Sequence, residues 1–167
     1  MKIFDEKFRK NKLRYMFQCF LATLSVFIIL LLLDNVSNAI TIASLGSSTF
    51  IVFTMPDAHL SKPRFLIGGY MVSIAMGMLC HQLPLLLLLD QYFIVSELSH
   101  VIFGSLSVGL AIFVMVITDT EHPPAAGLAL ALILDEWSYM TIAITMVGII
   151  SLSALKALLK PFLRNLL

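Results

Sequence analysis

The chain has 167 residues, of which 59% are hydrophobic and only 13% are charged. Ordinary soluble domains are about one quarter charged, so this composition excludes a soluble domain and indicates an integral membrane protein. The formal net charge of +1 gives no sign of a nucleic-acid partner, and several membrane spans in so short a chain leave room for one domain.

Six apolar segments follow one another and predict an all-α fold, a polytopic bundle of transmembrane helices. A helix needs about 20 residues to span the hydrocarbon core of a bilayer. The first, second, fourth and sixth segments have about this length, and the third is followed, past Pro84, by five leucines at the membrane interface. The segments cover residues 15–33, 36–55, 65–80, 98–118, 123–134 and 139–159.

The second and fifth segments are unusual. Small and hydroxyl residues at 44–49 interrupt the second, and the fifth starts with two prolines and is too short to span a bilayer alone. The middle segment of each group of three is therefore the odd one. This pattern favours a 3+3 inverted repeat, in which two halves of three helices run in opposite directions. Transporters of this kind place the substrate site at their interrupted helices.

The basic residues predict the direction of each crossing. With six crossings and a cytoplasmic N-terminus, all eleven Lys and Arg residues lie on the cytoplasmic side. The turns at 34–37, 90–97 and 135–137 carry only acidic charges and then lie outside, as the positive-inside rule requires. If one or both of the unusual segments were re-entrant, basic clusters would move outside, so six crossings are favoured over four or five.

The predicted organisation follows from this topology. Residues 1–14 form a basic cytoplasmic N-terminus, residues 15–160 the transmembrane domain, and residues 161–167 a cytoplasmic tail. The expected location is the plasma (inner) membrane, with multiple passes and both termini cytoplasmic.

Small residues spaced four apart mark two helix-packing faces. Gly69, Ser73 and Gly77 share one face of the third segment, and Ser105 and Gly109 share one face of the fourth. Such faces let two helix backbones approach closely in a membrane. The contact can be within the chain or between copies, so a homo-oligomer is an expected partner alongside the lipid bilayer.

The stretch from Thr118 to Gly127 carries the most unusual chemistry of the chain. Pro123 and Pro124 cannot continue a helix but suit the first turn of a new one, where a missing N–H is no loss. The free N–H groups of the next three residues would then point back along the helix axis, and a helix start of this kind attracts anions. The three residues are Ala125, Ala126 and Gly127.

The neighbouring polar residues have alternative roles. His122 is either a hydrogen-bond donor or proton relay, because its charge changes near neutral pH, or a residue that caps and fixes the helix start. Asp119 and Glu121 would repel an anion, so we expect them in solvent at the cytoplasmic mouth or paired with Lys62 or Arg64. Hydroxyls of the second segment either donate to a substrate or bond carbonyls of their own helix.

The run Glu-His-Pro-Pro-Ala-Ala-Gly at 121–127 resembles the signature of the HPP family of small integral membrane proteins. Ser47-Ser48 with Met55-Pro56, and Lys62-Pro63-Arg64 followed by Gly68-Gly69, are similar to other recurring features of that family. The resemblance covers residues from about 15 to 160. It implies a membrane protein, and plant chloroplast and cyanobacterial relatives are nitrite transporters. Members are usually described with four transmembrane helices, whereas the charges of this chain favour six.

Together these features predict a transporter or channel for a small monovalent anion, most readily nitrite by the family resemblance. The chain is expected not to be an enzyme and to need no cofactor and no metal. The alternatives are a membrane-embedded enzyme or metal site on Asp119, Glu121 and His122, and a structural membrane subunit. The predicted substrate site combines both unusual segments: Gly46, Ser47, Ser48, His122, Pro123, Pro124, Ala125, Ala126 and Gly127.

Overall fold

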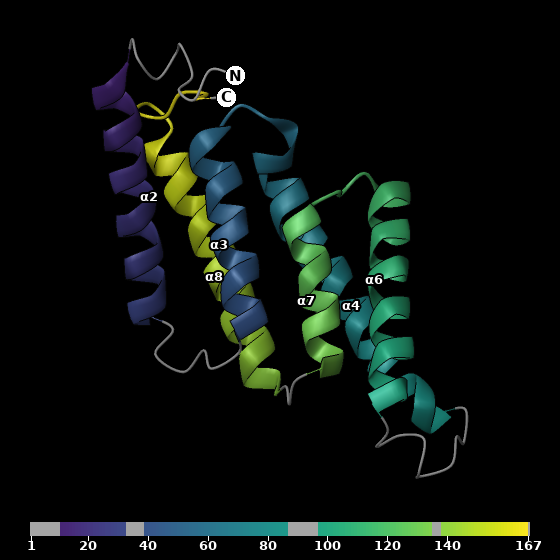
Figure 1. Cartoon of the computed structure of the whole chain (residues 1–167). Coiled ribbons are helices and arrows are strands. Elements are labelled where there is room, and N and C mark those ends of the chain that lie inside the picture. Colours follow the sequence, from purple (N-terminus) through teal and green to yellow (C-terminus); the bar gives the residue numbers. More distant parts are fainter. Residues whose placement is uncertain (1–10, 33–38, 87–96, 135–137, 167) are drawn as a thin grey trace, which may run out of the picture.

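The computed structural model describes residues 11–32, 39–86, 97–134 and 138–166. Within these ranges the chain forms six α-helices and one 3-10 turn, which confirms the predicted all-α bundle (Figure 1). The elements are α2 (Lys12–Leu32), α3 (Ala39–Thr54), η1 (His59–Ser61), α4 (Pro63–Leu86), α6 (Glu97–Thr118), α7 (Pro123–Leu134) and α8 (Tyr139–Leu159).

Most helix boundaries agree with the hydrophobic pattern. The bounds of α7 and α8 are those predicted, and the ends of α2, α3 and α6 differ by three residues or fewer. The exception is α4, which continues to Leu86 and takes in Pro84. Pro84 lies in the last turn of α4, where the N–H that it lacks would have bonded the Cys80 carbonyl. The helix therefore loses one hydrogen bond near its end.

The prediction that the second segment is interrupted at 44–49 is wrong, because α3 is one continuous helix. Its hydroxyl residues remain helical by bonding carbonyls one turn earlier. Ser47 Oγ donates to the Ala43 carbonyl at 2.9 Å, and Thr49 Oγ1 donates to the Leu45 carbonyl at 2.9 Å. Such bonds satisfy the hydroxyl without breaking the helix. The segment is unusual only in being short.

The helices alternate in direction along the chain (Figure 1). The start of α2, the end of α8, the connection between α3 and α4, and the connection between α6 and α7 all lie at one end of the bundle. This is the arrangement that the six-crossing topology requires. The acidic turns predicted at the other end fall outside the described residues, except for Glu97 at the start of α6.

Three described helices are long and apolar enough to cross a membrane: α4, α8 and the Leu98–Thr118 part of α6. Two more apolar helices are shorter, namely α7 and the Ile40–Thr54 part of α3. The two short helices are the middle members of the two groups of three. They are therefore the ones that depend most on protein neighbours.

The packing of the helices has the symmetry of two inverted halves. The α2–α3 contact corresponds to α6–α7, the α4–α7 contact to α8–α3, and the α4–α6 contact to α8–α2. The α3–α7 and α4–α8 contacts each join two corresponding helices, so exchanging the two halves leaves these contacts unchanged. Corresponding helices also run in opposite directions (Figure 1). The contact pattern thus agrees with the predicted 3+3 arrangement, with α3 and α7 packed against each other.

The small-residue face of α4 packs within the chain. A Cβ atom at Gly77 would lie 2.8 Å from Leu132 Cδ1 and 3.1 Å from the Ala129 carbonyl oxygen, both on α7. Gly69 and Ser73 on the same face are also buried. By contrast, Ser105 and Gly109 on α6 are exposed, and a Cβ at Gly109 would meet nothing within 4 Å. The face that is open to a second copy is therefore on α6.

Candidate functional site

The end of α6 directs the chain toward the bundle. Asp119 has a left-handed backbone conformation, with φ of 54°. Its N–H donates to the Val116 carbonyl, and the Thr120 N–H donates to the Met115 carbonyl at 3.0 Å. This is the Schellman pattern that ends many helices, with aspartate in the position that glycine usually holds. Aspartate is one of the few residues with a side chain that tolerate this conformation.

An ion pair fastens the same turn to α4. Arg64 Nη2 lies 3.3 Å from Asp119 Oδ2 and donates to the Thr118 carbonyl at 3.0 Å. Asp119 is therefore paired with Arg64, one of the two basic partners predicted for it. Both side chains are more than half exposed, so the ion pair adds little to the stability of the fold. Its contacts join the turn after α6 to the start of α4.

Two glycines of α4 let the connection at 119–122 approach the helix closely. A Cβ at Gly68 would lie 2.8 Å from Thr120 Cγ2. A Cβ at Gly69 would lie 2.6 Å from His122 Cβ and 3.1 Å from the Thr120 carbonyl oxygen. Real Cβ atoms do not approach this closely, so only glycine fits here. The connection consequently carries His122 into the bundle, where its side chain is fully buried.

The buried His122 belongs to a polar cluster of three side chains from three segments. His122 Nε2 lies 2.8 Å from Ser48 Oγ on α3, and Ser48 Oγ lies 3.0 Å from the Tyr70 hydroxyl on α4. The Tyr70 and His122 rings are 5.9 Å apart. All three residues are fully buried. We call Ser48, Tyr70 and His122 the polar cluster; it is uncharged when the histidine is neutral.

The second ring nitrogen of His122, Nδ1, is buried. It makes no side-chain hydrogen bond among the described residues, and the backbone group that acts on the ring is the Leu60 carbonyl. His122 lies in the connection outside the spanning helices, and burial lowers its pKa to about 4, with the Leu60 carbonyl acting in the opposite direction. The ring is therefore neutral at physiological pH. This favours a hydrogen-bonding role over a proton relay working near neutral pH.

The start of α7 offers fewer free donors than predicted. Pro123 and Pro124 have no N–H, and the Ala125 N–H is used in a hydrogen bond to the His122 carbonyl at 2.9 Å. Ala125 therefore does not supply the free donor that the sequence suggested. Gly127 instead serves packing, since a Cβ there would lie 3.2 Å from Ser44 Oγ on α3. The two short helices approach each other closely at this point.

The structure separates the predicted site residues into two groups. Ser48 and His122 are in contact, and the α7 start lies beside them. Gly46 and Ser47 are exposed within the continuous helix α3, away from the polar cluster. Their backbone N–H groups belong to a helix interior rather than a helix start, so they cannot form the predicted anion site. Tyr70 is a further member of the site that was not predicted, because its only sequence signal is a lone tyrosine after Gly68-Gly69.

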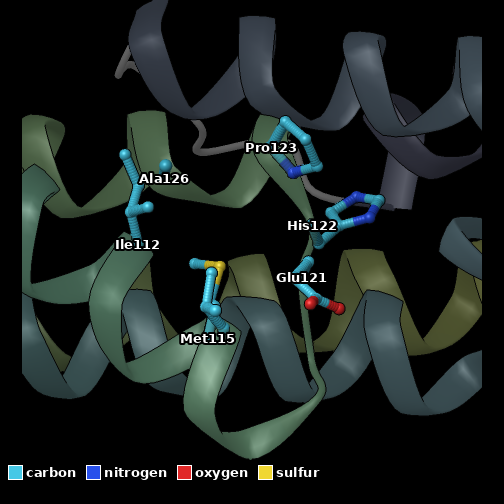
Figure 2. A pocket seen from close by; sticks show the side chains of 7 residues that line it. Ile112, Met115, Glu121, His122, Pro123 and Ala126 are labelled. Atoms are coloured by element: carbon cyan, nitrogen blue, oxygen red, sulfur yellow. The ribbon is translucent and has the colours of Figure 1, made fainter.

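A pocket of about 280 Å³ lies between α6 and the start of α7. Figure 2 shows the side chains around it, with His122 and Glu121 as its polar groups. The other walls are apolar and come mainly from α6 and α7. The lining residues are Ile112, Met115, Val116, Glu121, His122, Pro123 and Ala126. His122 lines the pocket but is fully buried, so the pocket surface beside it is apolar.

The described residues offer no alternative constellation for metal binding. Within the described ranges, no three His, Cys, Asp or Glu side chains are grouped to hold a metal ion. Asp119 is directed to Arg64 rather than to His122. In the same ranges the buried polar side chains are hydroxyls, one amide and the His122 imidazole, and none is a carboxylate.

Comparison with known families adds one finding. The family model described as HPP, transmembrane region, matches residues 8–165, which is nearly the whole chain. No curated protein and no solved structure matches it.

Proposed function

The chain belongs to the HPP transmembrane family, and we propose that it moves a small monovalent anion across the membrane as a transporter or channel. Nitrite is the first substrate to test, because the Glu-His-Pro-Pro-Ala-Ala-Gly resemblance extends to nitrite transporters. One observation carries the proposal: an uncharged cluster of hydrogen-bonding groups, Ser48, Tyr70 and His122, is buried inside an apolar helix bundle.

The chemistry of the buried groups favours an anion over a cation. Protein sites for cations present carboxylates or several carbonyl oxygens. The buried polar side chains described above include no carboxylate, whereas hydroxyl and imidazole N–H groups donate hydrogen bonds to anions. A neutral donor cluster stabilises a single negative charge without trapping it, which suits passage of a monovalent ion.

Transport is favoured over the enzymatic alternative by the same geometry. A catalytic or metal site on Asp119, Glu121 and His122 would require the three side chains to converge. Asp119 instead pairs with the exposed Arg64, at the end of the bundle. The polar cluster also contains no carboxylate to activate Ser48 through His122, as the third member of a hydrolytic triad would.

The direct test is uptake of nitrite into liposomes that contain only the purified protein. We expect uptake to exceed that of protein-free liposomes, to saturate with nitrite concentration, and to respond to an imposed membrane potential. A liposome preparation with His122→Leu protein at equal density serves as the control for leakage through the bilayer. Equal nitrite uptake in protein-containing and protein-free liposomes would refute nitrite as the substrate. The same result for chloride, formate and nitrate would refute transport of small monovalent anions.

The membrane orientation forms part of the proposal. We expect both termini and the end bearing Lys62 and Arg64 to face the cytoplasm of the plasma membrane, because basic residues are retained on that side. The test uses Lys62→Cys in a background with Cys19 and Cys80 replaced. An impermeant maleimide should label position 62 only after cells are permeabilised. Tyr139→Cys, at the opposite end of α8, should be labelled in intact cells, and the reverse pattern would contradict the orientation.

We also propose that copies of the chain associate through the outer face of α6. Ser105 and Gly109 are exposed there, and small residues at this spacing favour close helix contacts. Native mass spectrometry in mild detergents should show an oligomer that Gly109→Leu dissociates. A wild-type protein that stays monomeric in several mild detergents would count against this association.

A further inference from the structure

A second polar site lies at the same end of the bundle, separate from the polar cluster. It is a pocket of about 290 Å³ between the α3–α4 connection and the last turns of α8. Three of its lining side chains are lysines, Lys62, Lys156 and Lys160, and one is a carboxylate, Asp57. We call this the basic pocket. Three ammonium groups against one carboxylate leave an excess of two positive charges.

Lys156 gives the basic pocket a fixed position. Its Nζ atom donates to the Ser61 carbonyl at 2.6 Å and to Ser61 Oγ at 2.8 Å. Ser61 is fully buried, and its hydroxyl also reaches the Pro56 and Ala58 carbonyls, at 2.8 Å each. An ammonium group has three N–H donors, so one donor of Lys156 has no partner in the described part of the chain. The lysine is thus held in place with one donor to spare.

The walls around Lys156 are also held in place. Asp57, Lys62 and Lys160 are all close enough to act electrostatically on Lys156. The Asp57 N–H donates to Asn165 Oδ1 at 3.1 Å, which joins the α3–α4 connection to the C-terminal segment. The basic pocket is therefore bounded by segments linked through hydrogen bonds, rather than by lysines that extend independently into solvent.

We propose that the basic pocket binds a phosphate group, from an anionic phospholipid or from a soluble phosphate compound. A charge excess of two matches phosphate, which carries between one and two negative charges. Lysine binds phosphate as a point charge. The pocket lies where α4 begins and α8 ends. Basic pockets between transmembrane helices at the cytoplasmic face bind anionic lipid headgroups. The site is independent of the anion proposed to cross the membrane.

The test measures binding to the purified full-length protein in mild detergent. Native mass spectrometry compares phosphatidylglycerol with phosphatidylcholine of the same acyl chains, and equilibrium dialysis with labelled inorganic phosphate measures soluble phosphate. Lys62→Gln/Lys160→Gln should weaken binding roughly thirtyfold, or roughly fivefold per lysine. Lys12→Gln/Arg14→Gln removes the same charge at the same end of the bundle, outside the basic pocket, and should leave binding unchanged. Lys156 is left intact because it holds Ser61.

The outcomes separate the sources. Preferential binding of phosphatidylglycerol that inorganic phosphate does not displace identifies a lipid headgroup site. Saturable binding of inorganic phosphate that competes with the lipid identifies a soluble phosphate compound. The proposal is overturned if neither probe binds, if both double variants weaken binding equally, or if nitrite displaces the probe while phosphate does not. Displacement by nitrite alone would assign the pocket to the transport path. The other two outcomes would overturn phosphate binding but would leave the proposed nitrite uptake unaffected.

Discussion

Replacing Ser48 with alanine is expected to lower nitrite uptake by roughly tenfold or more, because the change removes the centre of the polar cluster. Ser48 Oγ lies within hydrogen-bond distance of both His122 and Tyr70. Its loss leaves buried polar groups on both neighbours without that partner, which costs about 1–3 kcal/mol. The measurement is the initial uptake rate in liposomes, normalised to the amount of inserted protein.

The adjacent serine provides a matched control. Ser47 is exposed, and its hydroxyl bonds the Ala43 carbonyl within the same helix. Ser47→Ala should therefore retain wild-type uptake. If both variants transport equally well, the polar cluster has no part in the passage of the anion. If both lose activity together, the serine pair acts as the sequence alone suggested, and the distinction drawn from the structure fails.

Replacing Gly69 with alanine is expected to destabilise the protein by about 1–3 kcal/mol, the usual cost of overpacking. The new Cβ would lie 2.6 Å from His122 Cβ and 3.1 Å from a backbone oxygen, so α4 and the 119–122 connection would have to separate. This separation would also displace His122 from Ser48. We expect the thermal unfolding midpoint of the purified protein to fall by roughly 5 °C, and nitrite uptake to fall with it.

Gly46→Ala is the control for this prediction. Gly46 is also a helical glycine, but it is exposed on α3 and a Cβ there would meet nothing within 4 Å. Alanine favours the helix over glycine, so this variant should unfold at the wild-type temperature or slightly above it. Equal midpoints for the Gly69 and Gly46 variants would show that the connection does not rest on α4 as described.

The sequence was sufficient to predict elements with strong boundary signals. The start of α7 was marked by its two prolines, and α8 followed from a long apolar run whose one charge, Lys156, lies in the last turn. Ser138 caps α8, where its Oγ accepts the Thr141 N–H at 3.2 Å. Small-residue spacing on α4 likewise predicted a close packing face, although its partner, α7, could not be identified from spacing alone.

Other features depend on contacts that a local pattern does not contain. The hydroxyl-rich run in α3 resembled a helix break, since serine and threonine compete with helical hydrogen bonds in water. Inside an apolar bundle the same hydroxyls bond their own helix and leave it intact. The Ser48–His122 contact joins residues 74 positions apart, and Ser48–Tyr70 joins residues 22 apart. The charge pattern predicted the six-helix order, but it held no information about these pairs.

The shortness of α7 has a consequence for biosynthesis. Twelve residues extend about 18 Å, well short of the about 30 Å of a bilayer core, so lipid alone cannot hold this helix in place. When α7 leaves the ribosome, α4 has already been made, and α4 carries the glycine face on which α7 packs. We therefore expect insertion of α7 to follow its docking on the earlier helices, so that the first half of the chain acts as the template on which the second half is integrated.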